Sequence, residues 1–183
     1  MRISKADLQR RWAWSSALAF AVFLVLAALD SGLKAQSGLG VRDLVGFGSA
    51  QPLRVVLEHW WRPIFALSAG FGLGLGYLFL PLYGAAFYLS GIIAREGYAP
   101  RPGLLRRALD MLALVPLVGA LCDAASRALY FWMLMKGTSD FLATLAAEAG
   151  LAASIAFLIG LALFVAAFVS VLAKRKLAAD MAV

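Results

Sequence analysis

Cysteine and histidine are almost absent from this sequence. Its 183 residues include one cysteine, Cys122, and one histidine, His59. A single cysteine forms neither an intrachain disulfide nor a CxxC pair, which excludes a thiol–disulfide oxidoreductase. A single histidine excludes a haem held between two histidines of this chain, and the two residues together do not suffice for a His/Cys zinc site. We therefore expect no metal and no cofactor.

Charged residues are also scarce. They make up 15% of the chain, whereas hydrophobic residues make up 63%. Soluble domains have roughly 25% charged and 45–50% apolar residues. The mean hydropathy of +0.84 agrees with this difference. The composition excludes a soluble globular domain and a disordered chain, and it indicates an integral membrane protein. The phosphate-binding motif GxxxxGK[ST] and the hydrolase motif GxSxG do not occur.

Four apolar segments are long enough to cross a bilayer, which takes roughly 20 residues. They cover residues 12–29, 64–94, 108–135 and 150–173. The sequence therefore predicts an all-α membrane protein, with four transmembrane helices in a single domain over residues 1–183. The first segment is longer than the apolar run of roughly 7–15 residues in a signal peptide, so we expect it to remain uncleaved.

Basic residues predict the orientation of these helices. They are concentrated before the first segment, between the second and third, and after the fourth, so both termini are expected to be cytoplasmic. The same loops explain the net charge of +7 without nucleic acid. This topology fits a bacterial inner membrane. The basic residues on the expected cytoplasmic side are Arg2, Lys5, Arg10, Arg11, Arg95, Arg101, Arg106, Arg107, Lys174, Arg175 and Lys176.

Residues 30–63 form the longest predicted outer loop. Within it, Leu53, Val56, Leu57 and Trp60 recur at i, i+3, i+4 and i+7, which is the spacing of one helical face. The pattern predicts a short amphipathic helix on the outer leaflet. Either its apolar face meets lipid with the tryptophans at headgroup level, or it caps the helix bundle. The expected interfacial anchors are Trp12, Trp14, Trp60 and Trp61.

Small residues occupy every second position near the start of the second segment. Ser68, Gly72 and Gly76 form one small-xxx-small row, and Gly70 and Gly74 form another. Such rows allow neighbouring helix backbones to approach closely. We expect this helix to pack centrally in the bundle through both rows. A contact with a second copy, or a groove for a flat ligand, stays open as an alternative.

Two opposite charges occur inside the third segment. Asp123 and Arg127 are four residues apart and therefore share a helical face. A charge near the bilayer centre costs roughly 2.5–3.5 kcal/mol on insertion scales, so the pair should face protein or a watery cavity. The pair is either a fixed structural contact or part of an acid–base site. Other residues that could join it in one polar cluster are Asp30, Glu58, His59 and Ser126.

Two segments resemble parts of a family of uncharacterised bacterial four-helix membrane proteins. Residues 77–83, with the sequence YLFLPLY, resemble the second-helix motif of that family. Residues 119–130 resemble its third helix, with Asp123 in the position of the family's aspartate. The resemblance implies a four-helix membrane fold and no known activity. The chain differs from the family's acidic and amide positions at Gly76, Ser126 and Arg127.

Three kinds of function stay open. The small size and few polar groups favour a non-enzymatic accessory subunit or binding module. A protein that binds or modifies a lipid- or sterol-like ligand would need an acid–base site around Asp123, with Asp30 or His59 as a second group. An oligomeric channel or transporter subunit would assemble through the glycine rows. The expected partners are membrane lipids and either other membrane subunits or a second copy, and not nucleic acid.

Overall fold

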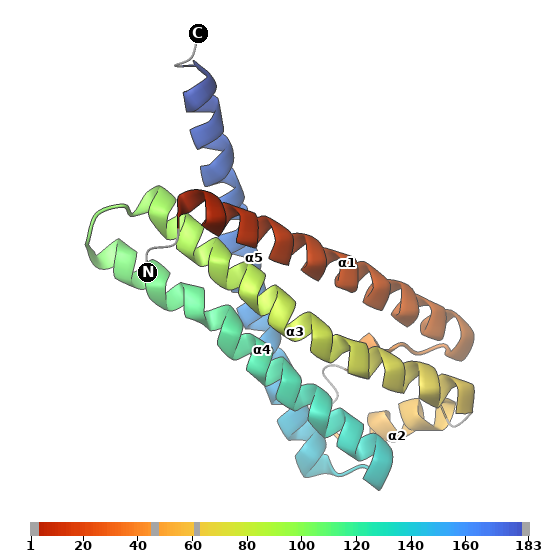
Figure 1. Ribbon diagram of the computed structural model, residues 1–183. Coiled ribbons are helices and arrows are strands. Elements are labelled where there is room, and N and C mark those ends of the chain that lie inside the picture. Colours follow the sequence, from red (N-terminus) through yellow and green to blue (C-terminus); the bar gives the residue numbers. More distant parts are fainter. Residues whose placement is uncertain (1–3, 45–47, 61–62, 181–183) are drawn as a thin grey trace.

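The computed structural model describes residues 4–44, 48–60 and 63–180, except the side chains of residues 42, 44, 57, 59, 63, 66 and 175–180. Within these ranges the chain is entirely helical and contains no strand. The elements, shown in Figure 1, are α1 (Lys5–Ser37), the short 3-10 helix η1 (Val41–Leu44), α2 (Ala50–His59), α3 (Pro63–Tyr98), α4 (Leu104–Lys136) and α5 (Asp140–Asp180).

Four of the helices are long and apolar enough to cross a membrane, namely α1, α3, α4 and α5. The predicted all-α fold with four candidate spans is thereby confirmed. Each helix extends beyond the apolar segment that predicted it, because hydropathy detects the apolar stretch and not the polar turns at its ends. Both α3 and α4 continue through an internal proline, Pro81 and Pro116 respectively.

Helix α1 carries local signals at both ends. The hydroxyl oxygen of Ser4 accepts a hydrogen bond from the backbone N–H of Asp7 at 3.1 Å, which is an N-cap. Gly38 ends the helix with a φ of 82°, a left-handed conformation that glycine adopts without strain. The helix therefore runs about two turns past Asp30, so the predicted outer loop begins later than residue 30.

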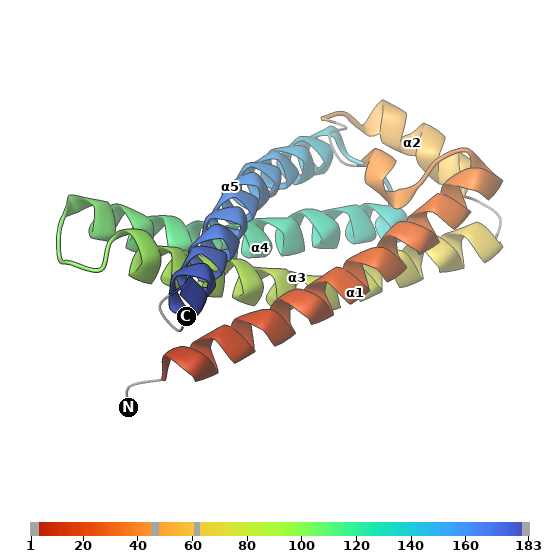
Figure 2. The same cartoon turned by 90° about the horizontal axis from the view of Figure 1, so that it is seen from above.

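Helix α3 is central, because it packs against α1, α4 and α5. The start of α1, the α3–α4 turn and the last turns of α5 lie at one end of the bundle, called here the terminal end (Figure 1). At the other end, called the α2 end, η1 and α2 bridge α1 and α5 (Figure 2). Toward the terminal end, Trp12 of α1 packs on Phe164 of α5 with ring centroids 5.5 Å apart. From there α1 and α5 diverge toward the α2 end in both views.

Glycines bring the helices together, although not through both predicted rows. An added Cβ at Gly91 would lie 2.5 Å from the Cβ of Ala113 on α4, and one at Gly119 would overlap α5. By contrast, no described atom lies within 4 Å of a Cβ added at Gly70 or Gly74. The expected close packing through that second row is therefore not found within the described part of the chain. Glycine spacing along one helix does not reveal where the neighbouring helices lie.

The apolar face predicted for residues 53–60 packs into the bundle. Leu53 and Val56 of α2, and Trp60 directly after it, are each 1% exposed and belong to one buried cluster with side chains of α1, α3, α4 and α5. The start of α2 is fixed as well, since the backbone N–H of Ala50 donates to Asp140 Oδ1 at 2.7 Å. Helix α2 therefore closes the α2 end of the bundle.

Two of the expected tryptophan anchors are buried. The Trp60 indole donates to the carbonyl oxygen of Leu39 at 3.1 Å. Trp12 is 8% exposed, and its indole donates to the Ser90 hydroxyl at 2.8 Å. In both residues protein groups cover the ring and accept the hydrogen bond of its N–H. Trp14 is 67% exposed, as an anchor requires, and Trp61 lies outside the described residues.

Candidate functional site

Asp123 and Arg127 form a two-point ion pair on α4. Arg127 Nε lies 2.8 Å from Asp123 Oδ1, and Arg127 Nη2 lies 3.2 Å from Asp123 Oδ2. Such charge-assisted, bidentate contacts are geometrically specific. The side chains are only 23% and 22% exposed, respectively. The pair uses two of the five N–H donors of the guanidinium, and the other three bond to no described residue.

Gly76 on α3 provides the space that the guanidinium occupies. A Cβ added at Gly76 would overlap Arg127 Nη1 and lie 3.0 Å from Cζ. In the same row, Gly72 and Ser68 lie on the wall of a cavity. The first predicted row therefore faces Arg127 and this cavity. One more neighbour is Val41 of η1, which is 3.6 Å from a Cβ added at Gly72.

Asp30 of α1 binds the backbone of the segment that follows this helix. Its Oδ1 accepts a hydrogen bond from the backbone N–H of Val41 at 2.5 Å. A second carboxylate, Asp43, accepts from the backbone N–H of Gly40 at 2.8 Å and pairs with Lys34 at 3.0 Å. The Gly40 N–H and the Lys34 ammonium lower the pKa of Asp43 below its ordinary value of 3.8. These contacts hold η1 beside the cavity.

A cavity of about 450 Å³ lies between α1, α3, α4, α5 and η1. Its wall includes Asp30 from α1 and Asp123, Ser126 and Arg127 from α4. The fold thus brings these four members of the expected polar cluster together. The Ser126 hydroxyl donates to the carbonyl oxygen of Ala146 at 2.8 Å, which joins α4 to α5 beside the cavity.

The two cluster residues expected from α2 are not part of this wall. Glu58 is exposed and does not line the cavity. The side chain of His59 lies outside the described residues. Among the side chains that the structure describes, no three His, Cys, Asp or Glu residues are grouped so as to hold a metal ion. The charged groups described at the cavity are therefore two carboxylates and one guanidinium.

A second, apolar cavity of about 260 Å³ adjoins the first. The two share four aromatic side chains, so they form two compartments of one site. The first has a largely apolar wall but carries the charged side chains and is called here the polar compartment; the second is called the apolar compartment. Tyr83 stands between the compartments, with its ring centroid 5.6 Å from that of Phe157 and 4.9 Å from that of Phe79. The aromatic residues that line the apolar compartment are Phe20, Phe23, Phe79, Tyr83, Phe87, Phe157 and Phe164.

Sequence reasoning missed this aromatic compartment. Its rings come from α1, α3 and α5, and no spacing along a single helix indicates that they meet. Both compartments are partly open to the surroundings. Leu158, on the wall of the polar compartment, is 64% exposed, and Phe20, on the wall of the apolar one, is 63% exposed. These residues belong to α5 and α1, the two helices that diverge in Figure 2.

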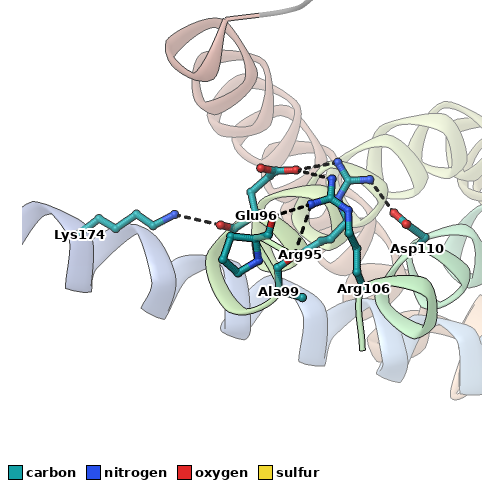
Figure 3. Close-up of polar contacts among 7 residues, drawn as sticks. Arg95, Glu96, Ala99, Arg106, Asp110 and Lys174 are labelled. Atoms are coloured by element: carbon teal, nitrogen blue, oxygen red, sulfur yellow. Dashed lines mark hydrogen bonds and ion pairs between the residues drawn. The ribbon is translucent and has the colours of Figure 1, made fainter. Parts of the chain in front are cut away.

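A separate ionic network lies at the α3–α4 turn (Figure 3). Arg95 pairs with Asp110 at 2.6 Å and with Glu96 at 2.9 Å, and Arg106 pairs with Glu96 at 3.2 Å. Lys174 of α5 donates to the Glu96 carbonyl oxygen at 3.5 Å. The network joins three helices at the terminal end and borders neither compartment. Its role is to fix the turn.

Comparisons of the chain with protein-family models, with curated proteins and with solved structures find no match. The resemblance of residues 77–83 and 119–130 to a bacterial four-helix family therefore has no support from a family model. It transfers no role to any residue of this chain. The case for a functional site rests on the two-compartment cavity.

Proposed function

We propose that this chain is a multi-pass protein of the bacterial inner membrane that serves as a non-enzymatic binding module for a membrane amphiphile. The observation that carries the proposal is the pair of adjoining cavities, one of about 450 Å³ with charged side chains on a largely apolar wall and one of about 260 Å³ that is apolar. Their sizes suit a small ligand, since ligand pockets measure roughly 300–1,000 Å³. A polar compartment beside an apolar one is complementary to a molecule with a head group and a hydrocarbon tail.

The proposed orientation places both termini in the cytoplasm. Basic residues collect at the terminal end, where Arg95, Arg106 and Lys174 meet, and cytoplasmic loops of membrane proteins are rich in such residues. The α2 end is then the outer end. Because the polar compartment contacts η1, it lies near the outer headgroup level, and the apolar compartment lies deeper. A lipid of the outer leaflet likewise has its head group at this level and its tail deeper in the bilayer, so its orientation matches that of the two compartments.

The proposed route of entry is sideways from the bilayer. Helix α2 closes the outer end of the bundle with its buried residues Leu53 and Val56 and with Trp60, which directly follows it. The exposed wall residues Phe20 and Leu158 belong to α1 and α5, which diverge toward that end (Figure 2). An amphiphile that moves laterally between these helices keeps its tail in hydrocarbon throughout.

Binding suits these carboxylates better than acid–base catalysis. Asp123 is held by Arg127 at two points, and Asp30 holds the Val41 N–H. A general base needs a lone pair directed at the substrate. Both oxygens of Asp123 and one oxygen of Asp30 already accept hydrogen bonds from this chain. The proposal therefore gives the polar groups the task of recognising a head group.

A place in a larger membrane complex is a second form of the same proposal. The row of Gly70 and Gly74 on α3 has no described atom within 4 Å of an added Cβ. Small residues on a lipid-facing helix surface allow another helix to approach closely. A subunit that docks there would leave the cavity accessible between α1 and α5.

The test is native mass spectrometry of the full chain, released from nanodiscs, which compares the wild type with two leucine variants. In Gly72→Leu a leucine projects into the cavity, whereas in Gly74→Leu it projects from the open face of the same helix. Wild type and Gly74→Leu are expected to carry a bound amphiphile, and Gly72→Leu is expected to lose at least about nine-tenths of it. Helical circular dichroism confirms folding. Equal retention by Gly72→Leu overturns the proposal.

A further inference from the structure

The polar compartment offers hydrogen-bond donors on one wall. Three of the five N–H groups of Arg127 bond to no described residue, although the side chain is only 22% exposed. Donors in such a position are satisfied by water or by a ligand, because leaving them unpaired is costly. A head group with acceptor oxygens therefore complements this wall.

The charge of the guanidinium is already balanced. Asp123 lies 2.8 Å and 3.2 Å from its nitrogens, so the pair is formally neutral. An anionic head that reached Arg127 would come close to the Asp123 carboxylate, and like charges that close repel one another strongly in a partly buried site. Asp30 lines the same cavity and holds the Val41 N–H. The nearby Lys34 is paired with Asp43 and does not line the cavity.

From these contacts we infer that the polar compartment selects an uncharged head group with acceptor oxygens, such as an ester or ketone carbonyl, and that Asp123 excludes anionic heads. The inference rests on the proposed function and adds the ligand class and a specificity-determining residue. Arg127 donates to the head group. Asp123 orients the guanidinium and cancels its charge. The tail occupies the compartment around Tyr83 and Phe157.

Two lipids that differ only in one phosphate test the inference. The probes are 1-oleoylglycerol, which is uncharged, and 1-oleoylglycerol-3-phosphate, which is anionic. Native mass spectrometry of the full chain measures the bound fraction of each probe at equal concentration. The wild-type chain is expected to bind the uncharged lipid at least about tenfold more tightly, because a phosphate that reaches Arg127 meets the Asp123 carboxylate.

A charge substitution at Asp123 tests the assigned role. Asp123→Asn keeps the shape of the side chain and leaves Arg127 without a counter-ion. The preference is expected to shift by at least about tenfold toward the anionic lipid. The control is Asp110→Asn, which removes a carboxylate of the same helix that pairs with Arg95 at the α3–α4 turn, away from both compartments. Its preference is expected to equal that of the wild type.

The outcomes separate the two proposals. If the wild type binds neither lipid, or if Gly72→Leu binds both as well as the wild type, the proposed function fails. If the wild type binds both lipids in the cavity but without preference, or prefers the phosphate, only the head-group inference fails. If Asp123→Asn folds and keeps the wild-type preference, the role of Asp123 fails. The wild-type comparison decides the ligand class even if that variant does not fold.

Discussion

The guanidinium of Arg127 lies against the backbone of Gly76, in space that any larger side chain would occupy. The ion pair with Asp123 is confined to α4, yet its position depends on a glycine of α3. Beside it, the Tyr77 hydroxyl donates to the carbonyl oxygen of Ala124 at 3.0 Å and joins the same two helices. The polar wall of the cavity is therefore a product of α3–α4 packing.

The first prediction concerns this contact. In Gly76→Ala the new methyl group overlaps Arg127 Nη1, so the guanidinium or the helix must move. We expect a loss of about 1–3 kcal/mol in unfolding free energy, measured by reversible unfolding in mixed micelles. Gly74→Ala is the control, since its methyl group meets no described atom and alanine favours a helix by up to about 1 kcal/mol. Equal stability of the two variants would show that Arg127 does not depend on Gly76.

The second prediction is a double-mutant cycle on the ion pair. Asp123→Ala leaves the partly buried Arg127 without its partner, so it is expected to destabilise the fold more than Asp123→Ala/Arg127→Ala does. The coupling energy is expected to be about 1–2 kcal/mol. Thermal unfolding of the four proteins in the same detergent measures it. Strictly additive effects would argue that the two side chains act independently.

The third prediction is a dependence on pH at the segment between α1 and α2. The folded-state pKa of Asp43 is lowered, so its stabilising contribution is complete above pH 3.8 and is lost as the pH falls below that value. Protection of the Gly40 amide in pulse-labelling hydrogen exchange is expected to fall in that acidic range. In Asp43→Asn, which has no titrating carboxyl, the protection of this amide is expected to be lower than in the wild type at neutral pH and not to fall further on acidification. Protection that does not change below pH 3.8 would contradict this role.

The fourth prediction concerns the attachment of α2. Asp140→Ala removes the acceptor for the Ala50 N–H, an interaction equivalent to a helix cap, and is expected to cost about 1 kcal/mol. Hydrogen exchange is expected to increase selectively across α2. Glu148→Ala, on the same helix and exposed, is the control and should leave α2 unchanged. A uniform increase over all helices would point instead to a global loss of stability.

Much of the fold could be predicted from local sequence. Long apolar runs give the four long helices, because a bilayer-length apolar stretch has few other stable arrangements. The spacing of Leu53, Val56 and Trp60 predicts a helix in this region, which the structure contains as α2, and it predicts the face that is buried. The i, i+4 spacing of Asp123 and Arg127 predicts their contact, because residues about one turn apart lie on the same face of a helix.

The positions of the small residues and tryptophans were harder to predict. Both glycine rows have the spacing of a packing surface, but the row of Gly72 and Gly76 meets a cavity and a guanidinium, and the row of Gly70 and Gly74 meets no described atom. Trp60 is a residue type that is common at membrane interfaces, and it is nevertheless buried within the protein. Amphipathic residues suit both environments, so their neighbours decide between them.

By itself the sequence determined which segments are helical, where the opposite charges can pair and which face of α2 is apolar, because these properties depend on neighbours within a few turns. Only the tertiary structure decided that Asp30 from α1 lines the same cavity as Asp123 and Arg127 of α4, and that rings from three helices form the adjoining compartment. The reason is physical. Contacts between helices depend on their rotation and crossing, which are set by how all the side chains pack together.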